Sequence, residues 1–135
     1  MREILFKAKR LDNGEWVEGY YIGPIGVLDV HEICDVHDIT GPRVEVDPST
    51  VCEYTGLTDK KGVKIFEGDI CLCPYIDPIF LAPWSEENNE KCKVLFERGA
   101  FIVEYEEKAN ILLSALSEKI EVIGNIHDRE REQSD

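Results

Sequence analysis

Three glycines spaced six residues apart divide the segment YTGLTDKKGVKIFEGDI, which runs from Tyr54 to Ile70, into short extended runs. Glycine adopts positive φ angles without steric cost, so it is the usual residue where a chain bends sharply between strands. The short polar side chain of Asp69 can accept backbone N–H groups at the last bend. We therefore predict that Gly56, Gly62 and Gly68 are structural corners of a small β-barrel and not parts of a reactive pocket.

Strand patterns lie on both sides of this segment. Residues 3–9 and 15–22 alternate between apolar and polar side chains and are joined at Asn13-Gly14, a pair that favours a tight hairpin. The same pattern predicts a second hairpin across Arg98-Gly99. Further strands are expected over residues 26–33, 43–46, 51–57, 63–66, 70–75, 91–97, 100–105 and 119–126. Gly124 interrupts the last of them and is predicted to be another structural corner. The expected fold is mainly β, a small β-barrel with the N-terminal hairpin as an extension.

The hydrophobic period changes between residues 106 and 119. Ala109, Leu112, Leu113 and Leu116 recur at intervals of three and four residues, which is one face of a helix. We expect one short helix of about three turns here, before the last strand.

The length of 135 residues suits a single domain, which we place at residues 1–128. Residues 129–135, REREQSD, contain charged and polar side chains with nothing to bury. We therefore expect this tail to be disordered.

The charge balance is strongly acidic. There are 28 Asp and Glu residues against 15 Lys and Arg, which gives a formal charge of -13. No Lys or Arg occurs from Leu11 to Pro42, a stretch that contains seven acidic residues. A surface of this sign repels phosphate backbones and anionic lipids, so direct binding to nucleic acid or to a membrane is not expected.

The sequence also predicts an intracellular, reducing compartment. No apolar run approaches the roughly 18 residues that span a bilayer, and MREILFKAKR at the N-terminus lacks the apolar core of a signal peptide. The cysteines are odd in number, scattered and without a CxxC pair, so we expect reduced, buried thiols. They are Cys34, Cys52, Cys71, Cys73 and Cys92.

Three separated blocks carry a resemblance to a known family. They are REILFKAKRLDNGEWVEGY, DPSTVCEYTGLTDKKGVKIFEGDI and EVIGNIHD, in this order, and they make up 51 of the 135 residues. Together they resemble the YopX family of phage and prophage proteins. The resemblance implies a small β architecture similar to SH3-like barrels and the cytoplasm of a bacterial host cell. It implies no established reaction and no catalytic residues.

Two groups of residues could bind a metal or take part in catalysis. His31, Cys34 and His37 are possible metal ligands at spacings of three, but this spacing suits a helix better than a strand. Glu67 and Asp69 could act as an acid and a base, yet no nucleophile or phosphate-binding loop stands beside them in the sequence. We therefore predict no bound metal, no cofactor and no enzyme. A metal-binding protein or metal-dependent enzyme that uses His31, Cys34 and His37 stays an alternative.

Surplus aromatic residues favour a role in contacts with other proteins. Tyr21, Phe80 and Trp84 are candidates for an interaction surface, and the apolar loop from Pro78 to Trp84 favours self-association. The predicted function is that of a non-enzymatic accessory protein that binds a protein partner and forms homo-oligomers. A second alternative is an acidic inhibitor that imitates nucleic acid and binds a basic partner.

Overall fold

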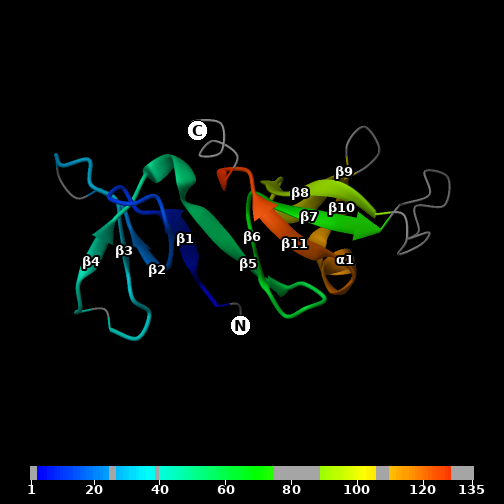
Figure 1. The fold of residues 1–135 in the computed structure, drawn as a ribbon, viewed down its shortest axis with the longest axis horizontal. Helices are drawn as coiled ribbons and strands as arrows, with labels where there is room; N and C mark the ends of the chain where they lie inside the picture. The colour runs from blue at the N-terminus through cyan, green and yellow to red at the C-terminus, as the bar shows by residue number, and fades with distance from the viewer. Residues whose placement is uncertain (1–2, 25–26, 39, 75–88, 106–109, 129–135) are drawn as a thin grey trace. The chain divides into compact units, whose positions relative to one another are not determined.

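The computed structural model describes residues 3–24, 27–38, 40–74, 89–105 and 110–128 (Figure 1). Contacts within the chain group it into two compact units, Met1–Tyr54 and Thr55–Asp135. Each unit has a hydrophobic core of its own. The single domain expected over residues 1–128 stays a prediction, and the tail at 129–135 lies outside the described residues.

The first unit is built on antiparallel strands in the order β4-β3-β2-β1-β5. A 3-10 helix connects β4 to β5, and β5 continues into the second unit. The elements are β1 (Phe6–Lys9), β2 (Trp16–Ile22), β3 (Glu32–Cys34), β4 (Arg43–Glu45), η1 (Pro48–Thr50) and β5 (Cys52–Thr58).

The predicted N-terminal hairpin forms, but it lies inside the sheet and is not an extension of it. β1 pairs with β2 from Phe6 opposite Gly19 to Lys9 opposite Trp16, and it pairs with β5 on its other side. Gly14 closes the turn with a φ of 72°, which is the left-handed conformation that the Asn-Gly pair predicted.

Gly19 allows β2 and β3 to approach closely. A Cβ atom at this position would lie 2.0 Å from the carbonyl oxygen of Cys34 and 2.8 Å from Cγ2 of Ile33. No side chain fits in this space, so glycine is required for β2 to lie this close to Ile33 and Cys34 of β3. Ile33 also belongs to the core of the unit, where it is buried with Ala8 and Val46.

The second unit contains a five-stranded antiparallel sheet in the order β10-β9-β8-β7-β11. The predicted hairpin between β8 and β9 turns at Arg98 and Gly99, which both have positive φ, 51° and 82°. The elements are β6 (Lys64–Phe66), β7 (Asp69–Pro74), β8 (Asn89–Glu97), β9 (Ala100–Tyr105), β10 (Asn110–Leu112), α1 (Leu113–Leu116), η2 (Ser117–Lys119) and β11 (Glu121–Asn125).

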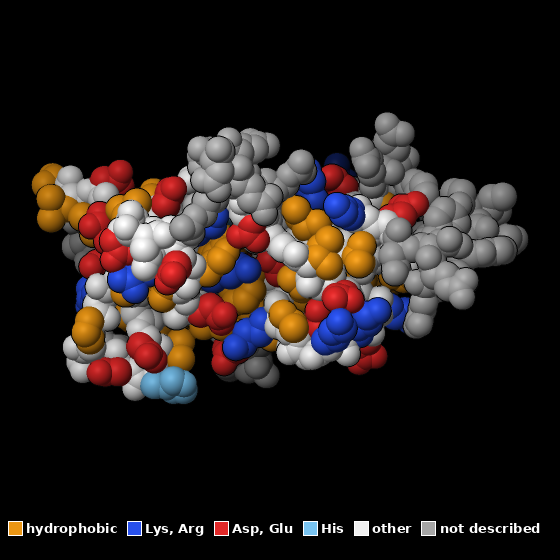
Figure 2. Space-filling model, viewed as in Figure 1, with side chains coloured by type: hydrophobic (Ala, Val, Ile, Leu, Met, Phe, Trp, Pro, Cys, Tyr) orange, Lys and Arg blue, Asp and Glu red, His pale blue; other side chains and the backbone are white. Residues whose placement is uncertain are grey.

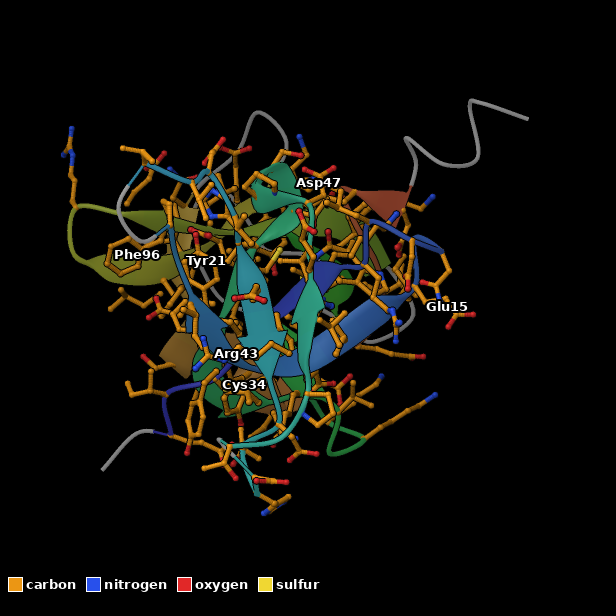
Figure 3. All side chains as sticks on the ribbon, turned by 90° about the vertical axis from the view of Figure 1, so that its left-hand side faces the viewer. Glu15, Tyr21, Cys34, Arg43, Asp47 and Phe96 are labelled. Carbon is orange, nitrogen blue, oxygen red and sulfur yellow. The ribbon has the colours of Figure 1, made fainter. Side chains whose placement is uncertain are left out.

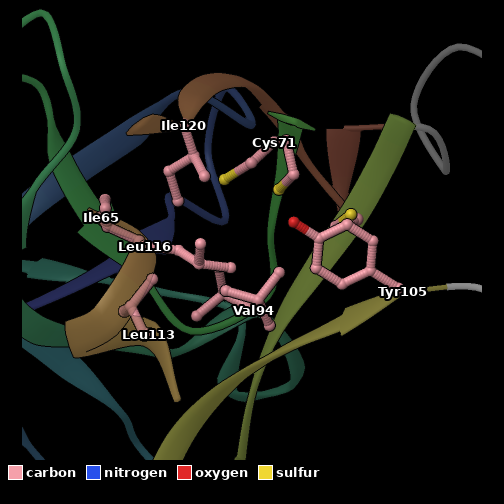
Figure 4. Packing of buried hydrophobic residues seen from close by; sticks show 10 residues of the cluster. Ile65, Cys71, Val94, Tyr105, Leu113, Leu116 and Ile120 are labelled. Carbon is pink, nitrogen blue, oxygen red and sulfur yellow. The ribbon is translucent and has the colours of Figure 1, made fainter. Parts of the chain in front are cut away.

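One core cluster holds the second unit together (Figure 4). Side chains from the sheet and from α1 converge in it, and Tyr105 reaches across the cluster to donate its hydroxyl to the carbonyl oxygen of Pro74 at 3.1 Å. Burial of this much apolar surface is the main stabilising term of such a unit. The buried members are Ile65, Cys71, Cys73, Cys92, Val94, Val103, Tyr105, Leu113, Leu116 and Ile120.

The expected helix before the last strand is confirmed as one short helix, but its predicted extent over residues 106–119 is wrong. Asn110–Leu112 form β10, in which Leu112 lies opposite Ile102 of β9 and is 55% exposed. Only Leu113 and Leu116 of the predicted apolar face are buried on α1. Pairing with β9 gives residues 110–112 backbone hydrogen bonds that outweigh the local helical pattern. Residues 106–109 lie outside the described part.

The mainly β class is confirmed, whereas the SH3-like barrel is not. The described strands form two antiparallel sheets with outer strands β4 and β6 in one and β10 and β11 in the other, and no barrel closes among them. In a barrel every strand has two neighbours, which these outer strands lack within the described residues. None of the helices in this part of the chain has the length and apolar sequence needed to cross a membrane.

Candidate functional site

The corner between β6 and β7 is held by a buried carboxylate. Asp69 is fully buried, and its Oδ2 accepts the backbone N–H of Phe66 at 2.8 Å. Its Oδ1 accepts the side-chain amide of Asn125 at 2.9 Å. Gly68 has a φ of 87° and donates its N–H to the carbonyl oxygen of Val94 at 2.7 Å. The corner is therefore fixed from β6, β8 and β11 together.

The closing sequence block EVIGNIHD meets this corner. β11 pairs with β7 so that Asn125 lies opposite Asp69, and the register shifts at Gly124, which is a bulge-like irregularity. Beyond it, Ile126 donates its N–H to the carbonyl oxygen of Gly68 at 2.9 Å. Two of the three sequence blocks that carry the family resemblance are thus in direct contact.

A second buried carboxylate, Asp59, lies in the turn between β5 and β6. Its Oδ1 accepts the N–H groups of Lys61 at 2.8 Å and Val63 at 2.9 Å, and its Oδ2 accepts that of Val122 in β11 at 2.9 Å. Burial acts to raise the pKa of Asp59, but these three bonds outweigh it, and the pKa lies below its ordinary value. The sequence indicates the turn but not the bond to β11, since nothing local points to a partner 63 positions away.

Both carboxylates therefore have a structural role. Asp59 is 5% exposed and Asp69 is fully buried, and each binds N–H groups of its own unit. A general acid or base must reach a substrate, which these atoms do not.

The two remaining predicted corners also have positive φ: 87° at Gly56, inside β5, and 82° at Gly62, in the Asp59 turn.

The structure does not bring His31, Cys34 and His37 together. His31 bonds the Tyr21 hydroxyl through Nδ1 and Oδ1 of Asp29 through Nε2, while Cys34 is buried in β3. Along an extended chain, residues three apart point to opposite faces. Among the residues that the structure describes, no group of three His, Cys, Asp or Glu side chains could hold a metal ion.

Tyr21 belongs to the packing of the first unit (Figure 3). It is half-buried in β2, its ring centroid lies 5.7 Å from that of Phe6, and it stacks on His31 at 5.9 Å. Phe80 and Trp84 lie outside the described residues. The predicted interaction surface of Tyr21, Phe80 and Trp84 therefore stays a prediction.

A pocket of about 280 Å³ opens in the first unit, where β3 ends. Strands β2, β3 and β4 supply its large apolar side chains, Val17, Ile33 and Val44. Every charged residue that lines it is acidic. The acidic stretch was evident from the sequence, but the pocket was not, because it depends on how three strands and a turn meet. The acidic and remaining lining residues are Glu18, Asp35, Asp38, Gly41 and Pro42.

Two of these acids are oriented by their own turn. Oδ1 of Asp35 accepts the N–H of His37 at 2.7 Å, and Oδ1 of Asp38 accepts the N–H and the hydroxyl of Thr40 at 3.2 and 2.8 Å. Such local bonds are typical of aspartate in turns. Within the described part of the chain, no hydrogen bond or ion pair reaches the Oδ2 atom of Asp35 or Asp38.

The described cations of the first unit make contacts with residues outside the pocket. Lys7 and Lys9 lie over one aromatic ring, with Nζ 4.6 and 5.5 Å from its centroid, and the two arginines approach other acids at 2.7 and 3.9 Å. The pocket therefore combines an apolar lining with the carboxylates of Asp35 and Asp38, which form no ion pair with these described cations. The pairs are Lys7 and Lys9 with Trp16, Arg10 with Asp12, and Arg43 with Glu32.

The five cysteines are free and buried, as the sequence predicted. Burial raises the pKa of the Cys71 thiol, and a hydrogen bond with Cys73 followed by burial raises that of Cys92. The pKa of Tyr105, beside them, is raised by burial and by the neighbouring thiols. Thiols that resist ionisation are poor nucleophiles, so this cluster acts as part of the core.

The comparisons with known proteins agree with this architecture. The profile of the YopX family, described as YopX protein, matches residues 5–131. The chain is similar to the crystal structure of protein EF1440 from Enterococcus faecalis, with a TM-score of 0.54 and 22% sequence identity over 96% of this chain and 97% of that one. At this identity the likeness shows the fold alone. No curated protein matches. Because the family match spans nearly the whole sequence, the chain belongs to the YopX family.

Proposed function

We propose that this protein is a phage or prophage accessory protein that acts in the bacterial cytoplasm by binding another protein, and that it is not an enzyme. The acidic excess of the first unit carries the proposal. Residues 1–54 contain eleven acidic and five basic residues. Figure 2 displays acidic side chains spread over the part of the surface that belongs to β2, β3 and β4, with few lysines or arginines among them.

A protein with a basic surface is the partner that this charge favours. Complementary potentials accelerate encounter and select against wrong partners, whereas phosphate backbones are repelled. The buried carboxylates of the second unit support a non-catalytic role, because Asp59 and Asp69 bind N–H groups of the fold itself. In this proposal the second unit is the scaffold and the acidic surface is the contact region.

A narrower form of the proposal is an acidic decoy that imitates nucleic acid. The same excess of acidic residues favours it, since a nucleic-acid-binding protein has a basic site that this surface could occupy. The two forms differ in one measurable property. A decoy competes with nucleic acid for its partner, whereas an ordinary contact leaves the nucleic-acid site of the partner accessible.

Self-association is a further part of the proposal. Phe96 is 48% exposed at the end of the β8–β9 hairpin, where its ring lies 4.9 Å from that of Phe101. An exposed aromatic side chain such as Phe96 favours contact between copies, whereas Phe101 is half-buried against the core. Light scattering after size-exclusion chromatography should give a mass above 15.4 kDa that rises with concentration. A monomer at every concentration would contradict this part.

Capture from a bacterial lysate tests the main proposal. The immobilised full chain should retain a specific basic protein at about 0.15 M salt and release it at about 1 M, because salt screens exposed charges. Replacement of acidic residues of the first unit should reduce the retained amount. The proposal would be contradicted if no protein is retained, or if the binding of the retained proteins depends neither on salt nor on the acidic residues.

A further inference from the structure

We infer that the pocket at the end of β3 binds an arginine side chain of a partner protein. This inference rests on the proposed function, because it names the chemical group that the acidic surface recognises. The observations that support it are the size of the pocket, its lining, the available carboxylate oxygens and their fixed orientation.

The size of the pocket suits one extended side chain. Its volume of about 280 Å³ is at the lower limit of the roughly 300–1,000 Å³ of sites that enclose drug-sized ligands or cofactors. All of its lining residues come from the first unit, from β2, β3, β4 and the turn between β3 and β4. It is open on one side, as a site for a side chain that enters from another molecule must be.

The lining matches a side chain that is apolar along its stem and charged at its end. Val17, Ile33 and Val44 offer aliphatic surface, against which the methylene groups of a long basic residue can pack. The three acids of the pocket offer the opposite charge to its head group. A neutral or acidic side chain would leave the carboxylates of Asp35 and Asp38 without a compensating charge.

The acceptor geometry favours arginine over lysine. Asp35 and Asp38 use Oδ1 for bonds within the turn, which leaves Oδ2 of each as an acceptor. Guanidinium donates in several directions from one rigid plane, whereas ammonium is a compact and strongly hydrated point charge. Two separate acceptor atoms in one turn are therefore better matched by guanidinium than by ammonium.

The turn holds these carboxylates before any partner binds. Thr40 and the N–H of His37 fix the aspartates, and Gly41 lies so close to Asp38 that an added Cβ would be 2.7 Å from its Oδ2. Acceptors that are already oriented lose little conformational entropy on binding. This is the property expected of a recognition site, in contrast to a freely moving acidic surface.

Nuclear magnetic resonance with defined peptides tests the inference on the full chain. The probes are acetyl-Gly-Gly-Arg-Gly-Gly-amide and two analogues in which lysine or neutral citrulline replaces the arginine. We expect the arginine peptide to shift the methyl signals of Val17 and Val44 and to bind at least about tenfold more tightly than the citrulline analogue, and about threefold more tightly than the lysine analogue. Equal affinity for arginine and citrulline, or for arginine and lysine, would overturn the assignment.

A charge-matched pair of variants separates the pocket from general electrostatics. Asp35→Asn with Asp38→Asn keeps the side-chain oxygens that accept the turn bonds, and it should weaken the arginine peptide at least about tenfold. Glu45→Gln with Asp47→Asn removes the same charge outside the pocket, and should change affinity less than about twofold. Equal effects of the two variants would overturn the inference.

The outcomes also separate this inference from the proposed function. If the arginine peptide does not bind in the pocket while a salt-sensitive partner is still captured from lysate, only the pocket assignment fails. If the peptide binds as described but no partner is retained, the proposed function fails.

Discussion

Oδ1 of Asp69 and Nδ2 of Asn125 lie 2.9 Å apart, although 56 positions separate these residues in the chain, and both are buried. This bond ties the corner before β7 to the end of β11. It joins the central and the closing sequence block, each of which by itself has only the residue pattern of a strand and a turn. Their contact explains why the closing Gly-Asn-Ile accompanies the glycine corners in this chain.

Replacing Asp69 by Asn should destabilise the second unit. An amide can present its single oxygen to the N–H of Phe66 or to the amide of Asn125, but not to both, so one buried donor faces an N–H group. We expect a loss of about 1–3 kcal/mol in the free energy of unfolding, measured with urea. Glu118→Gln, at an exposed position on η2, should stay within about 0.5 kcal/mol. Equal stabilities of the two variants would show that the bond does not hold the corner.

Asp59 should make stability depend on pH. Its pKa is lowered in the folded state, so its hydrogen bonds stabilise the protein above the unfolded pKa of about 3.9 and lose this effect as the pH falls. Asp59→Asn should therefore cost about 1–3 kcal/mol at neutral pH, and the difference from the wild type should shrink under acid conditions. Urea denaturation across this pH range measures it, with Glu118→Gln, at an exposed position, as control. A difference that is constant with pH would contradict the assignment.

Gly19→Ala should destabilise the first unit, because the new methyl group would lie 2.0 Å from the carbonyl oxygen of Cys34. The expected cost is about 1–3 kcal/mol, the usual range for overpacking. Gly23→Ala is the matched control, since its Cβ would make ordinary contacts with Tyr21 at 3.5 Å or more. Hydrogen exchange of β3 amides should accelerate only in the first variant. Similar exchange in both would argue against close approach at Gly19.

The thiols should be unreactive in the folded protein. All five cysteines are buried, and the pKa values of Cys71 and Cys92 are raised, so little thiolate is available for reaction. A colorimetric disulfide reagent should label them slowly under native conditions and all five rapidly in denaturant. Rapid labelling of any one thiol in native buffer would contradict a purely structural role for that residue.

Local features of the fold were predictable from the sequence. Both hairpins form at the Asn13-Gly14 and Arg98-Gly99 turns, because short-range turn chemistry decides such pairs. The predicted helix was too long, because residues 110–112 fit a helical hydrophobic pattern but pair with β9 as a strand. A closed barrel was also predicted, and none closes among the described strands. Glycine corners show where strands bend, but they do not show which distant strands pair.

The candidate site shows the same division. The acidic stretch was visible in the sequence, but the pocket needs Val17, Ile33 and Val44 from three strands beside the turn at Asp35 and Asp38. In the same way, the sequence marks Asp69 as a corner residue but does not reveal Asn125 as its partner. Contacts over long sequence separations are decided by strand pairing, which a local pattern does not contain.

The most direct test of the proposed function is the affinity of the captured partner for three forms of the full chain, measured by calorimetry at about 0.15 M and 1 M salt. The forms are the wild type, Asp35→Asn with Asp38→Asn, and Glu45→Gln with Asp47→Asn. We expect tight binding of the wild type and of the control at the lower salt concentration, weaker binding of both at the higher one, and a loss of at least about tenfold for the pocket variant at the lower concentration. Binding that is unchanged by salt and by all of these substitutions would contradict the view that this YopX family protein acts through its acidic surface.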